Sequence, residues 1–290
     1  MKNKILLIHI YCTICEHYST VKAYCQRFSN NSRPKFTDEE CIAIYFFGLI
    51  SGHYTQKAIY EFILDYWHDW FPTLPSYKKF NKRINMLSGC IQSLYGILTG
   101  KLNSQSETIE HVLDSMPIIL AKSKRSKKAC VAPEICDKGY CATKEMYYYG
   151  CKLHILAQRE QGTLPSERIV CISAASEHDL NVAKEYFSDL IQNLDLYLDK
   201  AYIDKKWQQE MLERNVKIFT PVKKSKKQEH LSAVDIAKNK SLSSVRETIE
   251  ALFSWLLEKT HLQNASKVRS TCGLIAFIFA RLCASAFLRF

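Results

Sequence analysis

Three carboxylates lie inside or beside strongly apolar segments, where a charge is costly to bury. Asp114 lies in "IEHVLDSMPIIL", Asp199 ends "LDLYLD", and Glu250 lies in the helical pattern "RETIEALF". A buried carboxylate must be hydrogen-bonded, paired or bound to metal. Carboxylates suit Mg²⁺, which usually takes one or two of them and keeps positions for water and phosphate. Three acids from separate elements could therefore hold two ions for phosphoryl displacement.

The stretch "LDLYLDKAY" (194–202) alternates as a buried strand does. Alternation puts Leu194, Leu196 and Leu198 on one face, and it puts Asp195 and Asp199 together on the other. The alternation alone does not show which of these two acids takes part in chemistry. Position favours Asp199, because sites in sheets flanked by helices form at the carboxyl ends of strands.

From residue 108 the sequence predicts strands and helices in alternation. The predicted strands are 109–120, 146–158, 168–175, 194–199 and 216–222, and the predicted helices are 178–191, 204–215 and two within 241–290. This order predicts an α/β fold with a mixed sheet flanked by helices. In the segment 241–261, Arg246 and Glu250 lie one helical turn apart. A solvated ion pair of little consequence is the ordinary interpretation of such spacing.

Residues 1–95 are predicted to be helical, with helices at 37–52, 55–71 and 77–87. Thr37 is a candidate N-cap. The third helix has an apolar face and a basic face. The basic residues are Lys78, Lys79, Lys82 and Arg83. Short helices that end in a basic one are compatible with a helix-turn-helix that meets DNA. A solvated basic helix in an ordinary bundle is the alternative.

The charge balance favours an anionic partner. The 290 residues carry 40 Lys and Arg against 29 Asp and Glu, a formal net charge of +11. Nucleic acid or an acidic membrane surface would fit this balance. Two basic runs, 122–128 and 223–227, are predicted as loops. The apolar stretches at both ends of the sequence are interrupted by His9 and Arg281, so we expect an intracellular protein without a membrane partner.

The 12 cysteines mostly lie in apolar stretches. That placement is typical of buried reduced thiols in a cytosolic protein. Cys130, Cys136 and Cys141 crowd one basic loop, with His154 downstream, so a structural zinc is an alternative. This spacing does not supply the four ligands of a closed zinc site, and we favour the thiol interpretation.

Several stretches together resemble the DDE transposases of bacterial insertion sequences, most closely the insertion-sequence nine-eighty-two group. They are "PKFTDEECIAIYFFGLISG", "FPTLPSYKKFNKRINML", "VLDSMPI", "YYGCKLHIL", "SEHDL", "LDKAY" and "RETIEALFSWL". They run in family order over nearly the whole chain. The resemblance implies a helical DNA-binding domain at 1–95, helix-turn-helix-like, and an RNase H-like catalytic domain at 106–290.

The resemblance implies that Asp114, Asp199 and Glu250 are the catalytic triad and bind Mg²⁺, with Mn²⁺ as a possible substitute. Arg246 would be the basic partner one turn before Glu250. Related transposases also place Tyr before that Arg and Lys after the Glu, where this chain has Ser243 and Leu257. Candidate DNA contacts are Lys78, Lys79, Lys82, Arg83, Lys124, Arg125, Lys127, Lys128, Lys152, Lys223, Lys224 and Arg246.

Other polar residues have simpler interpretations. Lys152 and His154 share a strand face, where packing competes with a phosphate contact. His178 and Asp179 open a helix, where Asp is favoured as a cap or first-turn acid.

The function expected from the sequence is DNA transposition by strand cleavage and strand transfer. The partner would be double-stranded DNA, both transposon ends and target, bound by a homodimer or larger assembly in the cytoplasm. A nuclease that cuts without joining and a non-catalytic DNA-binding regulator are the two alternatives.

Overall fold

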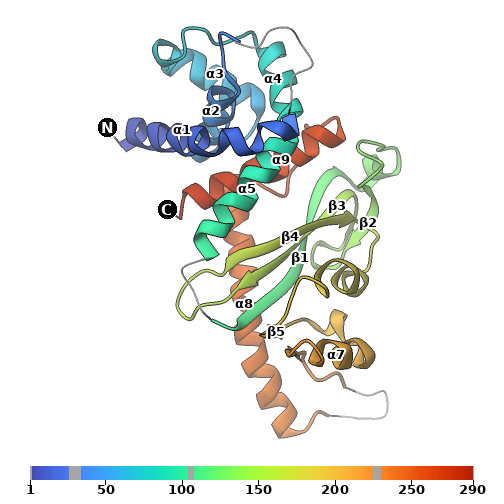
Figure 1. Cartoon of the computed structure of the whole chain (residues 1–290). Helices are drawn as coiled ribbons and strands as arrows, with labels where there is room; N and C mark the ends of the chain where they lie inside the picture. The colour runs from blue at the N-terminus through green and yellow to red at the C-terminus, as the bar shows by residue number, and fades with distance from the viewer. Residues whose placement is uncertain (1, 26–33, 104–107, 225–229, 290) are drawn as a thin grey trace. The chain divides into compact units, whose positions relative to one another are not determined.

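The computed structural model describes residues 2–25, 34–103, 108–224 and 230–289 (Figure 1). The chain divides into two units. One contains Met1–Gly100, Val131–Glu134 and Leu256–Phe290, and the other contains Lys101–Cys130 and Ile135–Trp255. We call them the helical unit and the sheet unit. Residues 225–227 of the second basic run, and the predicted domain start at 106, lie outside the described residues.

The helical unit is built from amphipathic and fully buried helices. Its helices are α1 (Lys2–Val21), α2 (Asp38–Ile50), α3 (Gln56–Tyr66), α4 (Tyr77–Met86), α5 (Ser88–Asn103) and α9 (Thr271–Phe287). α2 begins where the sequence predicts, because Thr37 and Glu40 form a reciprocal capping box. The Thr37 hydroxyl accepts from Glu40 N (3.2 Å), and the Glu40 carboxylate accepts from Thr37 N (2.6 Å).

A buried arginine lies in the apolar helix α9. The Arg281 side chain is 1% exposed and donates to the carbonyl oxygens of Tyr54 (2.6 Å) and Phe277 (3.2 Å). Its guanidinium also lies 3.5 Å from the centroid of the Phe277 ring. Burial lowers the pKa of Arg281. Within the part of the chain that is described, none of the helices is both long enough and apolar enough to cross a bilayer.

The sheet unit contains a mixed sheet, as predicted from the order of its elements (Figure 1). The strands are β1 (Glu110–Lys122), β2 (Asp137–Cys141), β3 (Met146–Gln158), β4 (Ser166–Ala174), β5 (Leu194–Tyr197) and β6 (Val216–Phe219). Their order is β2-β3-β1-β5-β6, and β4 also pairs with β3. β3 pairs antiparallel with β1, β2 and β4, whereas β1, β5 and β6 run parallel.

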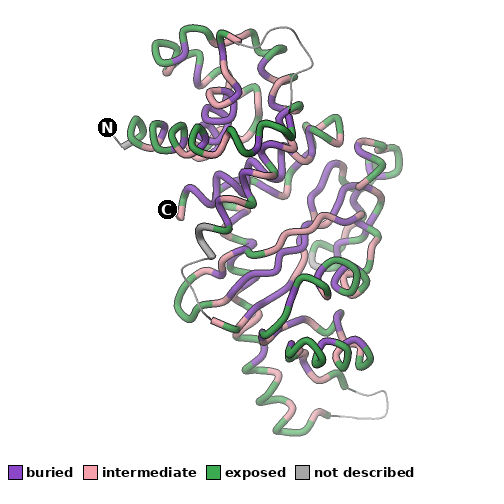
Figure 2. Tube along the Cα trace, viewed as in Figure 1, coloured by how far each residue is buried: buried purple, intermediate pink, exposed green. Residues whose placement is uncertain are grey.

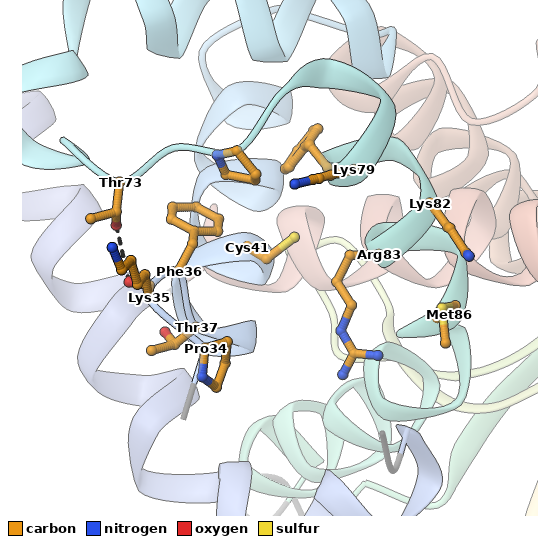
Figure 3. Close-up of a pocket in the computed structure, with 12 residues that line it drawn as sticks. Pro34, Lys35, Phe36, Thr37, Cys41, Thr73, Lys79, Lys82, Arg83 and Met86 are labelled. Atoms are coloured by element: carbon orange, nitrogen blue, oxygen red, sulfur yellow. Dashed lines mark hydrogen bonds between the residues drawn. The ribbon is translucent and has the colours of Figure 1, made fainter. Parts of the chain in front are cut away.

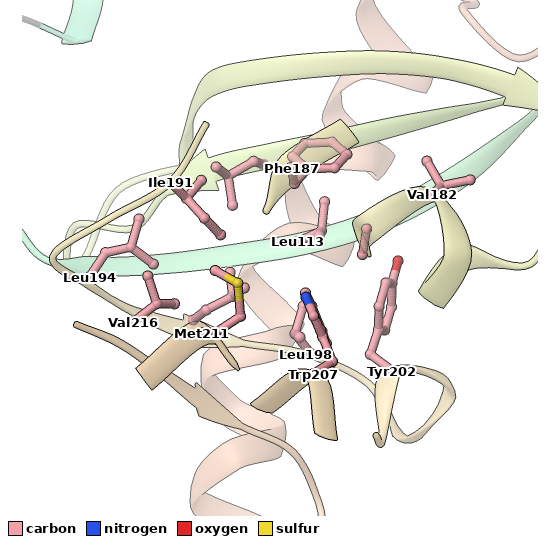
Figure 4. Packing of buried hydrophobic residues seen from close by; sticks show 13 residues of the cluster. Leu113, Val182, Phe187, Ile191, Leu194, Leu198, Tyr202, Trp207, Met211 and Val216 are labelled. Carbon is pink, nitrogen blue, oxygen red and sulfur yellow. The ribbon is translucent and has the colours of Figure 1, made fainter. Parts of the chain in front are cut away.

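One face of this sheet packs against short helices. They are α6 (Asp179–Val182), which continues as a π-helical turn at Ala183–Phe187, and α7 (Lys205–Leu212). A buried cluster joins β1 and β3, through Leu113 and Leu156, to Phe187 and Trp207 (Figure 4). The leucines of β5 and Leu198 lie in the same cluster. Figure 2 shows buried residues along the strands and exposed ones on the outer surfaces of these helices.

α8 (Ala233–Thr260) begins earlier than the apolar stripe predicts. The stripe residues Ile249, Leu252 and Leu256 are buried as expected. Ahead of the stripe, Val234 and Ile236 are exposed, so this part of α8 carries no amphipathic pattern for a sequence to reveal.

Candidate active site

Asp114 lies where β1 extends beyond its short parallel neighbour. β5 pairs only with Glu110, His111 and Val112 of β1. Two residues later, Asp114 Oδ1 accepts a hydrogen bond from the backbone N–H of Ser115 (2.8 Å). Burial raises the pKa of Asp114 to about 6, and the nearby charges of Asp179 and Asp199 act in the same direction. Asp114 is thus a desolvated acid on the part of β1 that continues past its pairing with β5, a step in the sheet that we call the notch.

Asp199 lies just past the end of β5, beside this notch. It caps the 3₁₀ turn Lys200–Tyr202, and its Oδ1 accepts from Lys200 N (2.6 Å). Because Leu194, Leu196 and Leu198 enter the core, Asp199 faces the opposite side of the strand. Asp195 lies inside the strand, where it pairs with Glu110 of β1. Asp199 is therefore the acid of β5 that lies next to Asp114.

Arg246 of α8 connects the second and third predicted acids. Its guanidinium lies 3.2 Å from Asp199 Oδ1 and 3.9 Å from Glu250 Oε1. The Arg246 side chain is 18% exposed, whereas that of Glu250 is 62% exposed. The closer contact is across the chain to Asp199, so this pair is more than a solvated contact within one helix. The charge of Arg246 also acts to lower the pKa of Asp114.

Replacing Arg246 with Met should raise the pKa of Asp114 above about 6 in metal-free protein, because a neighbouring positive charge is lost. Carboxyl-detected NMR titration in EDTA measures this pKa directly. Arg159→Met is the matched control, since Arg159 pairs with Glu110 near the start of β1. An unchanged or lower Asp114 pKa in Arg246→Met would contradict this arrangement.

A second polar group lies on the sheet face that α6 covers. The Lys152 ammonium donates to Asp179 Oδ1 (3.0 Å) and to the Glu177 carbonyl oxygen (2.7 Å), and Ser115 Oγ donates to Asp179 Oδ1 (3.2 Å). His154 lies deeper on the same face and bonds Ser173 Oγ at 2.8 Å. Burial lowers the pKa of His154 to about 4, so it is a neutral packing residue at pH 7.

The acids around Asp114 offer carboxylate oxygens, the ligand type that a hard cation takes. Asp114 interacts electrostatically with Asp179 and with Asp199. All three acids act on Tyr202, whose buried hydroxyl bonds no other described residue. No group of three or more His, Cys, Asp or Glu side chains within the described ranges is gathered tightly enough to hold a metal ion. Asp114 and Asp199 lie close together, whereas Glu250 reaches them through Arg246.

The predicted DNA contacts are mostly exposed. Those at the surface are Lys78, Lys79, Lys82, Lys124, Arg125, Lys127, Lys128, Lys223 and Lys224. The α8 side chain of Asn239 anchors the segment before Lys223, accepting from Val222 N (2.7 Å) and donating to Val222 O (3.2 Å). Asn239 precedes Arg246 by two turns, which is about 10 Å along a helix. The segment that leads into Lys223 and Lys224 is therefore held against the same helix that carries Arg246.

Arg83 differs from its basic neighbours on α4. Its Nε donates to Asp38 Oδ1 (2.6 Å), and one terminal nitrogen, Nη2, donates to both Asp38 Oδ2 and the Cys25 carbonyl oxygen. The Asp38 side chain is only 6% exposed, so this ion pair ties α4 to the start of α2. Lys79, Lys82 and Arg83 also line a cavity of about 580 Å³ (Figure 3). Phe36 and Phe80 are among its apolar lining residues.

The three loop cysteines have different surroundings. Cys136 and Cys141 are buried, and Cys130 is exposed. They do not form a metal-binding group with His154. Cys136 instead lies against Cys151 of β3, and this contact raises the pKa of the Cys151 thiol.

Asp114 and Asp199 thus lie beside adjoining parallel strands, with Arg246 of α8 in contact with Asp199. A scan against protein families matched the transposase DDE domain over residues 103–271. The chain therefore belongs to the transposase DDE-domain family, a family of enzymes that cut and transfer DNA. Comparisons with curated proteins and with solved structures gave no match.

Proposed function

We propose that this chain is a transposase that binds the ends of an insertion sequence, cuts them and joins them to target DNA. The observation that supports it best is the arrangement of Asp114 and Asp199 on adjoining parallel strands, with Arg246 between Asp199 and Glu250. This arrangement lies inside the matched DDE domain. We propose an RNase H-like catalytic domain at 106–290 and membership of the insertion-sequence nine-eighty-two group.

Asp114, Asp199 and Glu250 would hold Mg²⁺ or Mn²⁺. When bound, divalent cations of this kind activate an attacking oxygen and stabilise the leaving oxygen of a phosphodiester. Arg246 offers a guanidinium to phosphate, for which its geometry suits two parallel hydrogen bonds. Water would attack first, and the freed 3′ hydroxyl would then attack the target. The role of the protein side chains is to align these groups in a partly desolvated notch.

The helical unit would bind DNA through the exposed lysines of α4, in a helix-turn-helix-like manner at 1–95. The sheet unit would add the basic turn 123–127 and the anchored Lys223 and Lys224. These contacts would make binding steeply dependent on salt. Handling two ends calls for a homodimer or larger assembly on DNA, in the cytoplasm and associated with the nucleoid.

Replacing Asp199 with Asn should lower strand cleavage and joining by about 100-fold or more, the order lost with one electrostatic group of an active site. The assay uses labelled duplexes carrying the ends of the proposed element, supercoiled target DNA and Mg²⁺. Asp195→Asn, on the same strand, is the matched control and should retain activity.

Three outcomes separate the candidate functions. Cleavage without joining by the unaltered chain favours a nuclease. Metal-independent binding with no cleavage of any end sequence favours a DNA-binding regulator and excludes both enzymes. Full activity in Asp199→Asn would show that the acid assignment is wrong.

A further inference from the structure

Lys152 is fixed in one orientation by two oxygen atoms. Its ammonium lies 3.0 Å from Asp179 Oδ1 and 2.7 Å from the Glu177 carbonyl oxygen. The side chains of Lys152 and Asp179 are 18% and 23% exposed. Charges this far from water are costly to separate, because removing one partner leaves the other uncompensated. The pair is therefore a constrained feature of the sheet face, unlike a mobile surface lysine.

Ser115 forms hydrogen bonds both to this pair and to Asp114. Ser115 donates from Oγ to Asp179 Oδ1 (3.2 Å) and from its backbone N to Asp114 Oδ1 (2.8 Å). The strand register also places Ser115 near Lys152, since Ser115 lies opposite His154, and Pro117, two residues after Ser115, lies opposite Lys152. The ammonium is thus joined to Asp114 through Ser115 and Asp179.

The arrangement leaves Lys152 with a donor to offer. An ammonium has three N–H donors, and the two oxygens above take two of those donors. Nearby, the Tyr202 hydroxyl is buried, interacts with the charges of Asp114 and Asp179, and bonds no group in the described part of the chain. The third donor of the partly exposed Lys152 can therefore be offered to an acceptor that enters beside these acids, and phosphate oxygens are strong acceptors for ammonium groups.

We propose that Asp179 is a positioning residue, which holds the Lys152 ammonium so that it binds a phosphate oxygen of the DNA strand at the acid cluster. This inference rests on the proposed function and adds a member to its site. Asp179 acts through Lys152 and does not touch the reacting atoms. Its side chain, together with the Glu177 carbonyl oxygen, holds the Lys152 ammonium in place.

Charge alone makes the opposite prediction. Removing the negative charge of Asp179 should strengthen DNA binding if nothing else changes. If Asp179 positions Lys152, Asp179→Ala should instead remove the same phosphate contact that Lys152→Met removes. Asp179→Asn separates charge from geometry, because the amide oxygen can still accept from Lys152 and Ser115.

The test measures binding of the full chain to a labelled end duplex over a range of salt, with Ca²⁺ replacing Mg²⁺. Lys152→Met should reduce the slope of log K against log salt by about 0.9, the value for one phosphate contact. Asp179→Ala should reduce the slope equally and add nothing in the Lys152→Met background. Asp179→Asn should keep the original slope. Cleavage with Mg²⁺ should fall by about 100-fold in Lys152→Met.

Controls and contrary results are distinct. Lys206→Met and Glu210→Ala alter an exposed ion pair on α7 and should leave the cleavage rate unchanged. Tighter binding by Asp179→Ala with an unchanged slope would overturn the positioning role, whether or not the DNA is cleaved. If the wild type cleaves DNA and Lys152→Met cleaves at the same rate with the same salt dependence, this inference is overturned but the proposed function is not. Absence of metal-dependent cleavage in the wild type would instead contradict the proposed function, and the slopes would still decide the role of Asp179.

Discussion

Replacing Asp114 with Asn is expected to make the metal-free protein more stable at pH 7 and to abolish its activity. Asp114 has a folded-state pKa of about 6 against an ordinary value of 3.8. One pKa unit corresponds to about 1.4 kcal/mol, so ionised Asp114 costs the folded state on the order of 3 kcal/mol. Asn removes that cost, and its amide oxygen can still accept from Ser115 N.

The sign of the pH dependence follows from this raised pKa. At pH values below the unfolded pKa the carboxyl is neutral in both states, so the variant gains nothing. As pH rises from about 4 to about 6, the unfolded state releases its proton first and the wild type loses stability. The gain of Asp114→Asn should therefore develop over that window and stay constant above it.

Urea unfolding in EDTA at a series of pH values measures the free energy of unfolding for both proteins. Asp195→Asn, on the partner strand, should show no comparable gain. Strand cleavage with Mg²⁺ should fall by about 100-fold or more in Asp114→Asn. Equal stabilities at pH 7, or retained cleavage, would contradict the assignment of Asp114 as a desolvated active-site acid. Loss of function with a gain of stability is the signature expected of such a residue.

Replacing Arg281 with Ala should destabilise the helical unit by about 3–5 kcal/mol. The change deletes a buried side chain and leaves a cavity beside α9. It also removes the donor to the Tyr54 carbonyl oxygen. An unsatisfied buried carbonyl adds to the cost of the cavity. Thermal melting followed by circular dichroism measures the loss.

Arg281→Met should lose much less than Arg281→Ala, because Met fills the space and removes the cost of burying a charge. Arg269→Ala is the matched surface control. Arg269 also donates to two backbone carbonyls, but water can replace it there. Similar losses for the Ala and Met variants at position 281 would show that the hydrogen bond to Tyr54, and not packing, dominates.

Local patterns predicted the elements that hold the acids. The alternation of residues 194–199 placed Asp199 opposite the core leucines, and the structure keeps that division. The capping box of α2 likewise involves only four consecutive residues, Thr37 to Glu40, so a local pattern is enough to predict where the helix begins. β2 was missed because Asp137–Cys141 is short and contains Gly139, whose position against Ala175 leaves no room for a side chain. Such a strand is stabilised by pairing with a neighbouring strand, and its own sequence has little alternation of apolar and polar residues.

Pairing between distant residues could not be predicted from local patterns. Asp179 has the local features of a helix-cap acid, but its partner Lys152 comes from another element of the sheet. The position of Arg83 on a basic helix face favoured DNA, yet its guanidinium is bound to Asp38. In both cases residue type and spacing were read correctly, whereas the partner depends on the tertiary fold. Arg246 shows the same limit, since its contact with Asp199 is closer than the one within α8.

The place of Arg246 in the chain has a consequence for synthesis. The ribosome synthesises β1 and β5 before α8. In the nascent sheet unit, Asp114 and Asp199 would therefore come close together before Arg246 has been synthesised. Domains generally begin to fold while their chains are being made. We therefore expect Asp114 and Asp199 to repel each other in the unfinished sheet, and this repulsion to fall when α8 supplies Arg246. Proteins truncated before residue 233 should accordingly fold better at mildly acidic pH or with added divalent ions.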